Sequence, residues 1–394
     1  MKKKIAFIFS YKFSNIYTKK YQLENLSKFF NIIVYDLSKI YSPYLKKNIK
    51  INSRFKPNKL FILNNLSDFK SSLKKTSPDY TFLLGDISIY SELITLTKSV
   101  INTKFVSFST DNLLHLDFNL NKIAIKKILF SNKFFKFFLI IFKAALIKIV
   151  ILFKKKNEKK ITLDYLFYSG DKIGADSLMN AKKKISIPCL NFNDTIEIKN
   201  KKKKLIKKKY AVFIDPFYLF HDDYNNKKIM NRIGKPVSFN YFKEMNNFFS
   251  LLERKLKLKV VIASHPSCSI KKYKLFFNNR TCIQNETAHL VRDSEIVLTH
   301  PTTTAINFPI IYNKPLVLLT TNEMDKSFHY YKYLQMFKLI FKYNYLNVSS
   351  ISNNFVFPTF KIDKKAFKWH YKKFINSSNI TNKSLSEFVI KYLK

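Results

Sequence analysis

The first part of the chain alternates short apolar runs of β-favouring residues with longer amphipathic segments. Two amphipathic segments, Tyr21–Phe30 and Ser91–Val100, have the apolar spacing of helices. Strands that alternate with helices of this length predict a parallel sheet with helices on both faces. The runs that we predict as strands are Ile5–Phe9, Ile32–Tyr35, Tyr80–Leu84 and Phe105–Phe108.

A second block with the same rhythm begins near residue 210, after one more predicted strand over 164–170. The strands predicted in this block cover 210–217, 259–266, 296–299 and 314–320, and the helices lie near 241–255 and 286–294. Two such blocks predict an α/β protein with two Rossmann-type domains.

The length of 394 residues also favours two domains. The Lys-rich tract 199–209, "KNKKKKLIKKK", is typical of an exposed linker. We therefore predict a first domain over 1–200 and a second domain over 201–362. Residues 363–394 are expected to form a C-terminal helix that packs back on the first domain.

Residues 122–156 interrupt the first domain with an apolar segment that contains regularly spaced lysines. Its longest uncharged run extends only from Phe137 to Phe142, whereas a membrane-spanning helix needs about 18 apolar residues. On a helix the lysines would lie on one side and leave a broad apolar face. We predict a basic, apolar helix that lies in the membrane interface. A buried helix with one solvated face is the alternative.

The charge favours anionic surroundings. The formal net charge is +45, from 71 basic against 26 acidic residues, and lysines dominate the basic set. Lysine suits diffuse attraction to an anionic membrane surface better than the bidentate reading of bases. The basic tracts resemble linkers and the aromatic residues lie mainly in predicted strands, so we expect no nucleic-acid partner. A non-catalytic protein that binds anionic surfaces or nucleic acid remains an alternative.

The cysteines and the N-terminus indicate a cytoplasmic protein. Cys189, Cys268 and Cys282 are odd in number and form no metal-binding pair motif, which suits a reducing compartment. The opening "MKKKIAFIFS" has too short an apolar run for a signal peptide. We expect a peripheral protein at the inner face of the plasma membrane.

The residues with candidate chemistry follow predicted strands. In open α/β sheets, ligands bind at the carboxyl ends of the strands. A Thr cluster at a helix start can hold phosphate oxygens, a His can donate a proton to a phosphate, and a carboxylate can accept from a ribose diol. The simpler interpretation is that one Thr caps a helix. The nucleotide-binding candidates are Asp215, His265, Pro266, Glu286, His300, Thr302, Thr303 and Thr304.

Three stretches of the second block resemble a known family. They are "YAVFIDPFYLFHDD", "KVVIASHPS" and "ETAHLVRDSEIVLTHPTTTAINFPIIYNKPLVLLTTNE". Over about residues 210–325 the chain resembles bacterial surface-carbohydrate glycosyltransferases of GT-B type. The resemblance implies a GT-B-like architecture, in which two Rossmann-type domains face a cleft, with an acceptor-side domain over 1–200 and a nucleotide-binding domain over 201–362. The order of His-Pro, acid and hydroxyl pair is similar to sialyltransferases and related CMP-sugar transferases. The resemblance implies that His265 meets the nucleotide phosphate, that Glu286 meets the ribose, and that Thr302 and Thr303 hold the phosphate.

The first domain departs from that family. The sialyltransferases carry an acid-acid-Gly tripeptide whose carboxylate is the general base, and this chain has no such tripeptide. Asp86 and Asp111, which follow predicted strands of the first domain, are our candidates for the catalytic base, with His265 as the third catalytic residue. The alternative role of Asp86 and Asp111 is to cap the segments that follow them. The acids near Asp215 fit no metal-binding motif, so we expect neither a metal nor a cofactor.

These observations predict an inverting, metal-independent glycosyltransferase. Its donor would be a nucleotide sugar, with a CMP-nonulosonic acid or Kdo type favoured. Its acceptor would be a cell-surface polysaccharide or a lipid-linked glycan, as in capsule or O-antigen biosynthesis. A polyol-phosphate transferase of the CDP-glycerol type is the main alternative within enzymes.

Overall fold

The computed structural model describes most of the two predicted domains. The described residues are 2–43, 55–85, 87–110, 161–171, 179–199, 201, 203–220, 237–301, 303–327, 330, 334, 337, 344–377 and 383–394. The predicted membrane-interface helix over 122–156 lies outside the described residues. The same holds for Asp86, Asp111 and Thr302.

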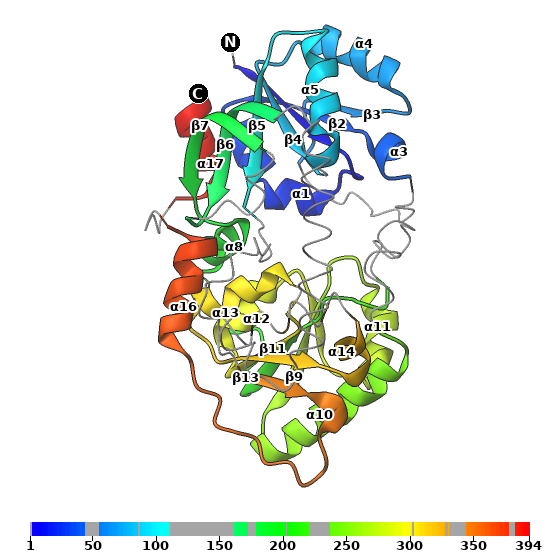
Figure 1. Cartoon of the computed structure of the whole chain (residues 1–394), viewed down its shortest axis with the longest axis vertical. Helices are drawn as coiled ribbons and strands as arrows, with labels where there is room; N and C mark the ends of the chain where they lie inside the picture. The colour runs from blue at the N-terminus through cyan, green and yellow to red at the C-terminus, as the bar shows by residue number, and fades with distance from the viewer. Residues whose placement is uncertain are drawn as a thin grey trace, which may run out of the picture.

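In the described residues, the first domain contains a seven-stranded sheet in the order β3-β2-β1-β4-β5-β6-β7, and every neighbouring pair is parallel (Figure 1). The inner strand β1 is apolar almost throughout, as expected for a strand buried on both faces. The strands are β1 Lys4–Phe9, β2 Asn31–Asp36, β3 Lys59–Ile62, β4 Tyr80–Leu84, β5 Lys104–Ser109, β6 Ile161–Ser169 and β7 Met179–Ile187.

Helices cover both faces of this sheet, and each face has its own apolar core. One core includes side chains of α2 and of the C-terminal helix α17, and the other includes side chains of α4 and α5. The elements are α1 Asn15–Lys20, α2 Leu23–Ser27, α3 Ser38–Tyr41, α4 Leu66–Thr76, η1 Ile87–Ile89, α5 Tyr90–Lys98 and α17 Leu385–Leu393.

The prediction of one helix over 21–30 is wrong. Gln22 has a left-handed backbone (φ 50°) between the end of α1 and the start of α2. Its buried side chain accepts a hydrogen bond from the backbone N–H of Ser386 (2.9 Å), near the start of α17. A tertiary contact between distant segments therefore accompanies this break, and local apolar spacing contains no sign of it.

The described part of the second domain contains a six-stranded parallel sheet in the order β10-β9-β8-β11-β12-β13. The strands are β8 Tyr210–Ile214, β9 Lys259–Ser264, β10 Cys282–Gln284, β11 Ile296–Thr299, β12 Leu316–Thr320 and β13 Asn344–Asn347. The helical elements are α8 Leu190–Ile198, α10 Asn240–Leu256, α11 Ile270–Phe276, α12 Thr287–Asp293, η3 Thr304–Ile306, α13 Asn307–Ile311, α14 Asn322–Lys326, η4 Val348–Ser350, α16 Lys364–His370 and the π-helical turn η5 Tyr371–Ile375.

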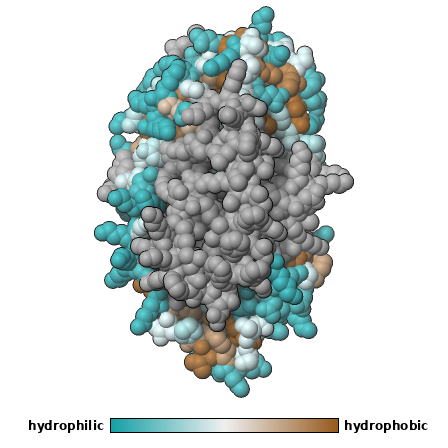
Figure 2. All heavy atoms as spheres, in the orientation of Figure 1, coloured by the Kyte–Doolittle hydropathy of each residue, from teal (hydrophilic) through white to brown (hydrophobic). Residues whose placement is uncertain are grey.

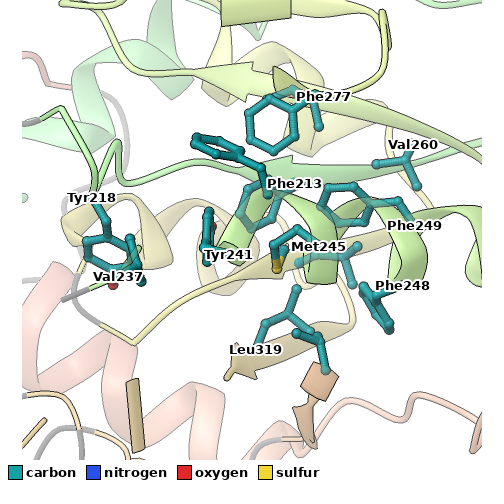
Figure 3. Packing of buried hydrophobic residues seen from close by; sticks show 14 of the residues in the cluster. Phe213, Tyr218, Val237, Tyr241, Met245, Phe248, Phe249, Val260, Phe277 and Leu319 are labelled. Atoms are coloured by element: carbon teal, nitrogen blue, oxygen red, sulfur yellow. The ribbon is translucent and has the colours of Figure 1, made fainter. Parts of the chain in front are cut away.

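The long helix α10 forms much of one core of this domain. Tyr241, Met245, Phe248 and Phe249 recur at helical spacing on one side and are buried. Figure 3 shows Phe249 beside Phe213 of β8, with the ring centres 5.2 Å apart, and Tyr241, Met245 and Phe248 belong to the same cluster. Burial of a large apolar side chain stabilises a fold by about 1.5–3 kcal/mol. The packing of α10 therefore stabilises one face of the sheet that carries the candidate site.

The chain crosses from the first domain to the second before α8, and it returns to the first domain between α16 and α17. Side chains of α8 and α16 belong to a core of the second sheet, whereas Leu385, Phe388 and Val389 of α17 belong to a core of the first. In Figure 1, α16 lies beside the lower domain and α17 beside the upper one. At this passage Ser169, the last residue of β6, donates a side-chain hydrogen bond to the carbonyl of Phe374 (3.0 Å).

The predicted α/β class with two Rossmann-type domains, each built on a parallel sheet, is confirmed. No helix in the described parts of the chain combines the length and apolarity needed to cross a bilayer. The described surface that Figure 2 displays is largely hydrophilic, in keeping with the high charge. In Figure 2, apolar residues gather at the lower end of this surface. Val356 is the most exposed of the large apolar side chains among the described residues, at 82%.

Candidate functional site

Four neighbouring strands of the second sheet bring the candidate residues to one edge. The sheet order places β10, β9, β8 and β11 side by side, and all of them run parallel. Their carboxyl ends lead in turn to Glu286, His265, Asp215 and His300. This is the edge at which ligands bind in open α/β sheets.

His265 follows β9 and lies in a closed turn. Pro266 comes next, and the N–H of Cys268 donates to the His265 carbonyl (3.0 Å). The ring nitrogen Nδ1 accepts a hydrogen bond from the backbone N–H of Ser267 (3.1 Å). Because a backbone N–H can only donate, the neutral ring carries its proton on Nε2. The residue is only partly buried, so this turn presents an imidazole N–H donor at the edge of the sheet.

Gln284 braces this turn and was not a candidate from the sequence. It ends β10 and pairs with Ser264, the residue before His265. Its side-chain Nε2 lies within hydrogen-bond distance of the carbonyl oxygens of His265 (3.0 Å), Pro266 (2.6 Å) and Cys268 (3.2 Å). The very short strand β10 gives no periodic signal, so sequence patterning could not place this amide beside the turn.

Asp215 lies inside the domain, directly after β8. It is 4% exposed and accepts hydrogen bonds from the Tyr273 hydroxyl and from the backbone N–H of Phe217 (3.1 Å). Burial raises the pKa of Asp215 to about 6, although these two hydrogen bonds act in the opposite direction. The carboxylate therefore organises the loop after β8, and its burial argues against the direct nucleotide contact that we expected.

Phe217 connects Asp215 to His265. Its backbone is left-handed (φ 63°), a conformation that costs a non-glycine residue about 1–2 kcal/mol. Its ring lies parallel to the His265 imidazole, with an interplanar angle of 0° and ring centres 5.3 Å apart. Phe217 itself is buried, so one face of the candidate histidine packs against the protein interior.

Glu286 occupies the N-cap position of α12, but its carboxylate does not cap the helix. The side chain is 36% exposed, and Oε2 lies 3.4 Å from Nδ1 of His289. Nε2 of the buried His289 lies 3.0 Å from the carbonyl oxygen of Lys203, so this nitrogen is the donor. Glu286 thus presents a partly exposed acceptor near the turn of His265.

Thr303 caps the helical segment that follows β11. Oγ1 of Thr303 accepts from the backbone N–H of Ala305 (3.2 Å), which makes Thr303 the N-cap of η3. Thr304 is the first residue of η3, and both threonines are partly buried. The helical segment is short, because α13 ends at Ile311. The capping role that we set against phosphate binding is therefore present for Thr303.

His300 belongs to the core. Its side chain is fully buried, and its ring packs against Phe213 and Tyr218. Nδ1 lies 2.7 Å from the Leu319 carbonyl and Nε2 lies 2.8 Å from the Tyr241 hydroxyl. Burial lowers the pKa of His300 to about 4, so the ring is neutral at pH 7. Both nitrogens are occupied, and we therefore correct its expected role from nucleotide contact to structural support.

The carboxyl edge of the first sheet comes close to this site. Lys19, at the end of α1, pairs with Asp194 (3.3 Å) and Glu197 (3.7 Å) on α8. Burial lowers the pKa of Lys19, but the carboxylates of these residues and of Glu286 outweigh it, and the net shift is upward. A first-domain lysine is thus within electrostatic reach of the acid proposed to meet the ribose.

The same edge of the first sheet is tightly packed between β1 and β4. Gly85 follows β4 with φ 127°, and a Cβ atom there would lie 1.9 Å from Oγ of Ser10. Glycine is therefore required at this position, which directly precedes Asp86.

The role of Asp86 or Asp111 as base stays a prediction. Within the described residues, no group of three or more His, Cys, Asp and Glu side chains could hold a metal ion.

Comparisons with known proteins identify similar architectures only. No protein-family model and no curated protein matches the chain. Similar solved structures include Arabidopsis thaliana UGT89C1 complexed with UDP, Acinetobacter baumannii MurG and Methanocaldococcus jannaschii UDP-GlcNAc 2-epimerase. Their identities are 11%, 7% and 12% and their TM-scores 0.48, 0.41 and 0.44. The matches cover 99%, 89% and 98% of this chain and 99%, 88% and 99% of the other chains.

Proposed function

We propose that the protein is a glycosyltransferase that moves a sugar from a nucleotide donor, with CMP-nonulosonic acid or Kdo donors favoured. The acceptor would be a surface polysaccharide or a lipid-linked glycan at the inner face of the plasma membrane, to which the +45 charge would attract the enzyme. The observation that carries the proposal is the His265 imidazole, whose Nε2 proton sits at the carboxyl edge of the nucleotide-domain sheet.

The proposed chemistry distributes three tasks over the two domains. The Nε2–H of His265 would donate to a donor phosphate oxygen and stabilise the charge that develops as the sugar leaves. Glu286 would accept from the ribose, and Thr302, Thr303 and Thr304 would line the phosphate. Asp86 or Asp111 of the first domain would remove the acceptor proton. Attack from the face opposite the leaving nucleotide would invert the anomeric centre without a metal ion.

Nucleotide binding tests this proposal directly. We expect calorimetric titration with CMP, CDP, UDP, GDP and ADP to show binding, with CMP preferred. Glu286→Gln should weaken the Kd about 10-fold or more, because a hydrogen bond to a charged group is worth about 1.5–3 kcal/mol. Glu295→Gln is the matched control, because Glu295 is exposed and precedes β11 at the opposite edge of the sheet.

Each outcome assigns the site. Preference for CDP, with phosphodiester in the product, would indicate the polyol-phosphate alternative. Equal weakening by both substitutions would show a general charge effect and not a ribose contact. Absence of binding to any of the five nucleotides would contradict the proposal.

A further inference from the structure

Phe217 and Gln284, which were not among the candidate site residues, contact the His265 turn from different sides. Phe217 contacts the ring and Gln284 contacts the backbone. We propose that Phe217 and Gln284 are positioning residues that hold the His265 imidazole in one orientation and in the Nε2–H tautomer. The catalytic meaning of this proposal rests on the proposed function, but its structural part can be tested without any substrate.

The ring contact restricts rotation of the imidazole. Parallel planes with centres 5.3 Å apart place the two rings in an offset stack, and a flip of the imidazole about its Cβ–Cγ bond must pass through edge-on positions that break this stack. The Phe217 ring also meets Tyr273 edge-on, with centres 5.2 Å apart. Because Tyr273 is itself hydrogen-bonded to Asp215, the ring that supports His265 is anchored in the core.

The backbone of Phe217 shows how the ring is placed. A bulky residue rarely adopts φ 63°, and here the Asp215 carboxylate accepts its N–H (3.1 Å). Strained backbones of this kind gather at functional sites, where the surrounding structure holds them in place. The buried carboxylate that the proposed chemistry does not use therefore has a task, namely to direct Phe217 toward His265.

The backbone contact fixes the partner of Nδ1. Gln284 bridges the carbonyl oxygens on both sides of Ser267, and this holds the Ser267 N–H at 3.1 Å from Nδ1. That hydrogen bond selects the tautomer, because it requires an unprotonated Nδ1 in the neutral ring. If the turn relaxed, both tautomers would become available to His265.

Imidazole nitrogen NMR on the full chain tests this proposal. The variants are Phe217→Leu, which keeps an apolar side chain without a flat face, Phe217→Tyr, which keeps the flat face, and Gln284→Met, which removes the amide. Phe220→Leu is the matched control, because Phe220 packs against Phe217 (5.7 Å between centres) in the same aromatic cluster. His265→Asn identifies the His265 signals by their loss.

We expect a single Nε2–H tautomer of His265 in the unmodified protein, in Phe217→Tyr and in Phe220→Leu. Phe217→Leu and Gln284→Met should show exchange between tautomers and bind CMP about 2- to 10-fold more weakly, the range that an aromatic pair of about 0.5–1.5 kcal/mol supports. If Phe217→Leu unfolds, Gln284→Met decides alone, because Gln284 is only partly buried and its replacement leaves the aromatic core intact.

One unchanged tautomer in both Phe217→Leu and Gln284→Met would overturn the proposal. So would equal exchange in the Phe220→Leu control. If the unmodified protein binds no nucleotide, the proposed function fails, and the NMR result alone decides whether these residues position the ring.

Discussion

At the residue scale, the chain uses the same dipeptide for two different purposes. His265-Pro266 and His300-Pro301 both follow strands of one sheet, but the first histidine is partly exposed and the second is fully buried. The difference comes from partners that are distant in sequence, since the Leu319 carbonyl of β12 accepts from Nδ1 of His300 and the Tyr241 hydroxyl of α10 donates to Nε2. Sequence reasoning could find both histidines but could not separate them.

Asp215 should give the stability a pH signature of its own. Its folded pKa of about 6 lies above the ordinary value of 3.8, so the folded state binds more protons between these values. Stability relative to Asp215→Asn should therefore rise as the pH falls from 7 to 4, by at most about 3 kcal/mol. Urea denaturation at pH 7 and pH 4.5 measures this difference. If the difference in stability between the unmodified protein and Asp215→Asn is the same at both pH values, as expected for the exposed control Glu295→Gln, the prediction is wrong.

At the element scale, the sequence patterns located the inner strands well and the outer ones poorly. The predicted 5–9, 80–84 and 296–299 agree with β1, β4 and β11 within one residue, because strands buried on both faces are continuously apolar. Strand β7, "MNAKKKISI", was missed because its three successive lysines are exposed at the edge of the sheet. The edge strands β3, β10 and β13 were missed as well, since their short runs offer little periodicity.

The candidate site was predictable to a similar degree. The strand-end rule brought His265 and Glu286 to one edge, and the structure agrees with this placement. Gln284 and Phe217 could not be found, because their importance comes from contacts across strands and from a backbone conformation. Neither residue type is distinctive in a sequence.

The passage between the domains offers a test at the element scale. Gly170 follows β6 with φ 70°, and a Cβ atom there would lie 2.0 Å from the backbone oxygen of Lys373. Gly170→Ala should therefore lower the free energy of unfolding by about 2 kcal/mol or more, through left-handed strain and displacement of the segment before α17. Denaturant titration followed by fluorescence measures the loss. Ser99→Ala, at the exposed end of α5, is the control that should change little.

At the scale of the whole molecule, the two sheets are joined by polar contacts as well as by the chain. Lys19 pairs with two acids of α8, and α8 packs on the core of the second domain. These side chains are partly exposed, so salt should weaken the contact. The lysine thus couples the position of α1 to the domain that carries His265 and Glu286.

Buried histidines should set the response of the whole molecule to acid. Burial lowers the pKa of His300 to about 4 and of His370 to about 3, from 6.5. His370 is held in the core by Oδ1 of Asn307 (3.1 Å). Near pH 5 the unfolded chain therefore binds about two more protons at these groups, whereas Asp215 binds one more in the folded state. The net excess is about one proton in favour of unfolding.

As the pH is lowered through 5, these three groups together should therefore decrease the free energy of unfolding by about 1.4 kcal/mol per pH unit. Denaturant titrations between pH 7 and 4.5 measure the slope. Replacing both histidines by Gln, which keeps an amide donor at each position, should reverse its sign, because only the Asp215 contribution then remains. A slope that the double substitution leaves unchanged would show that other groups govern the acid response.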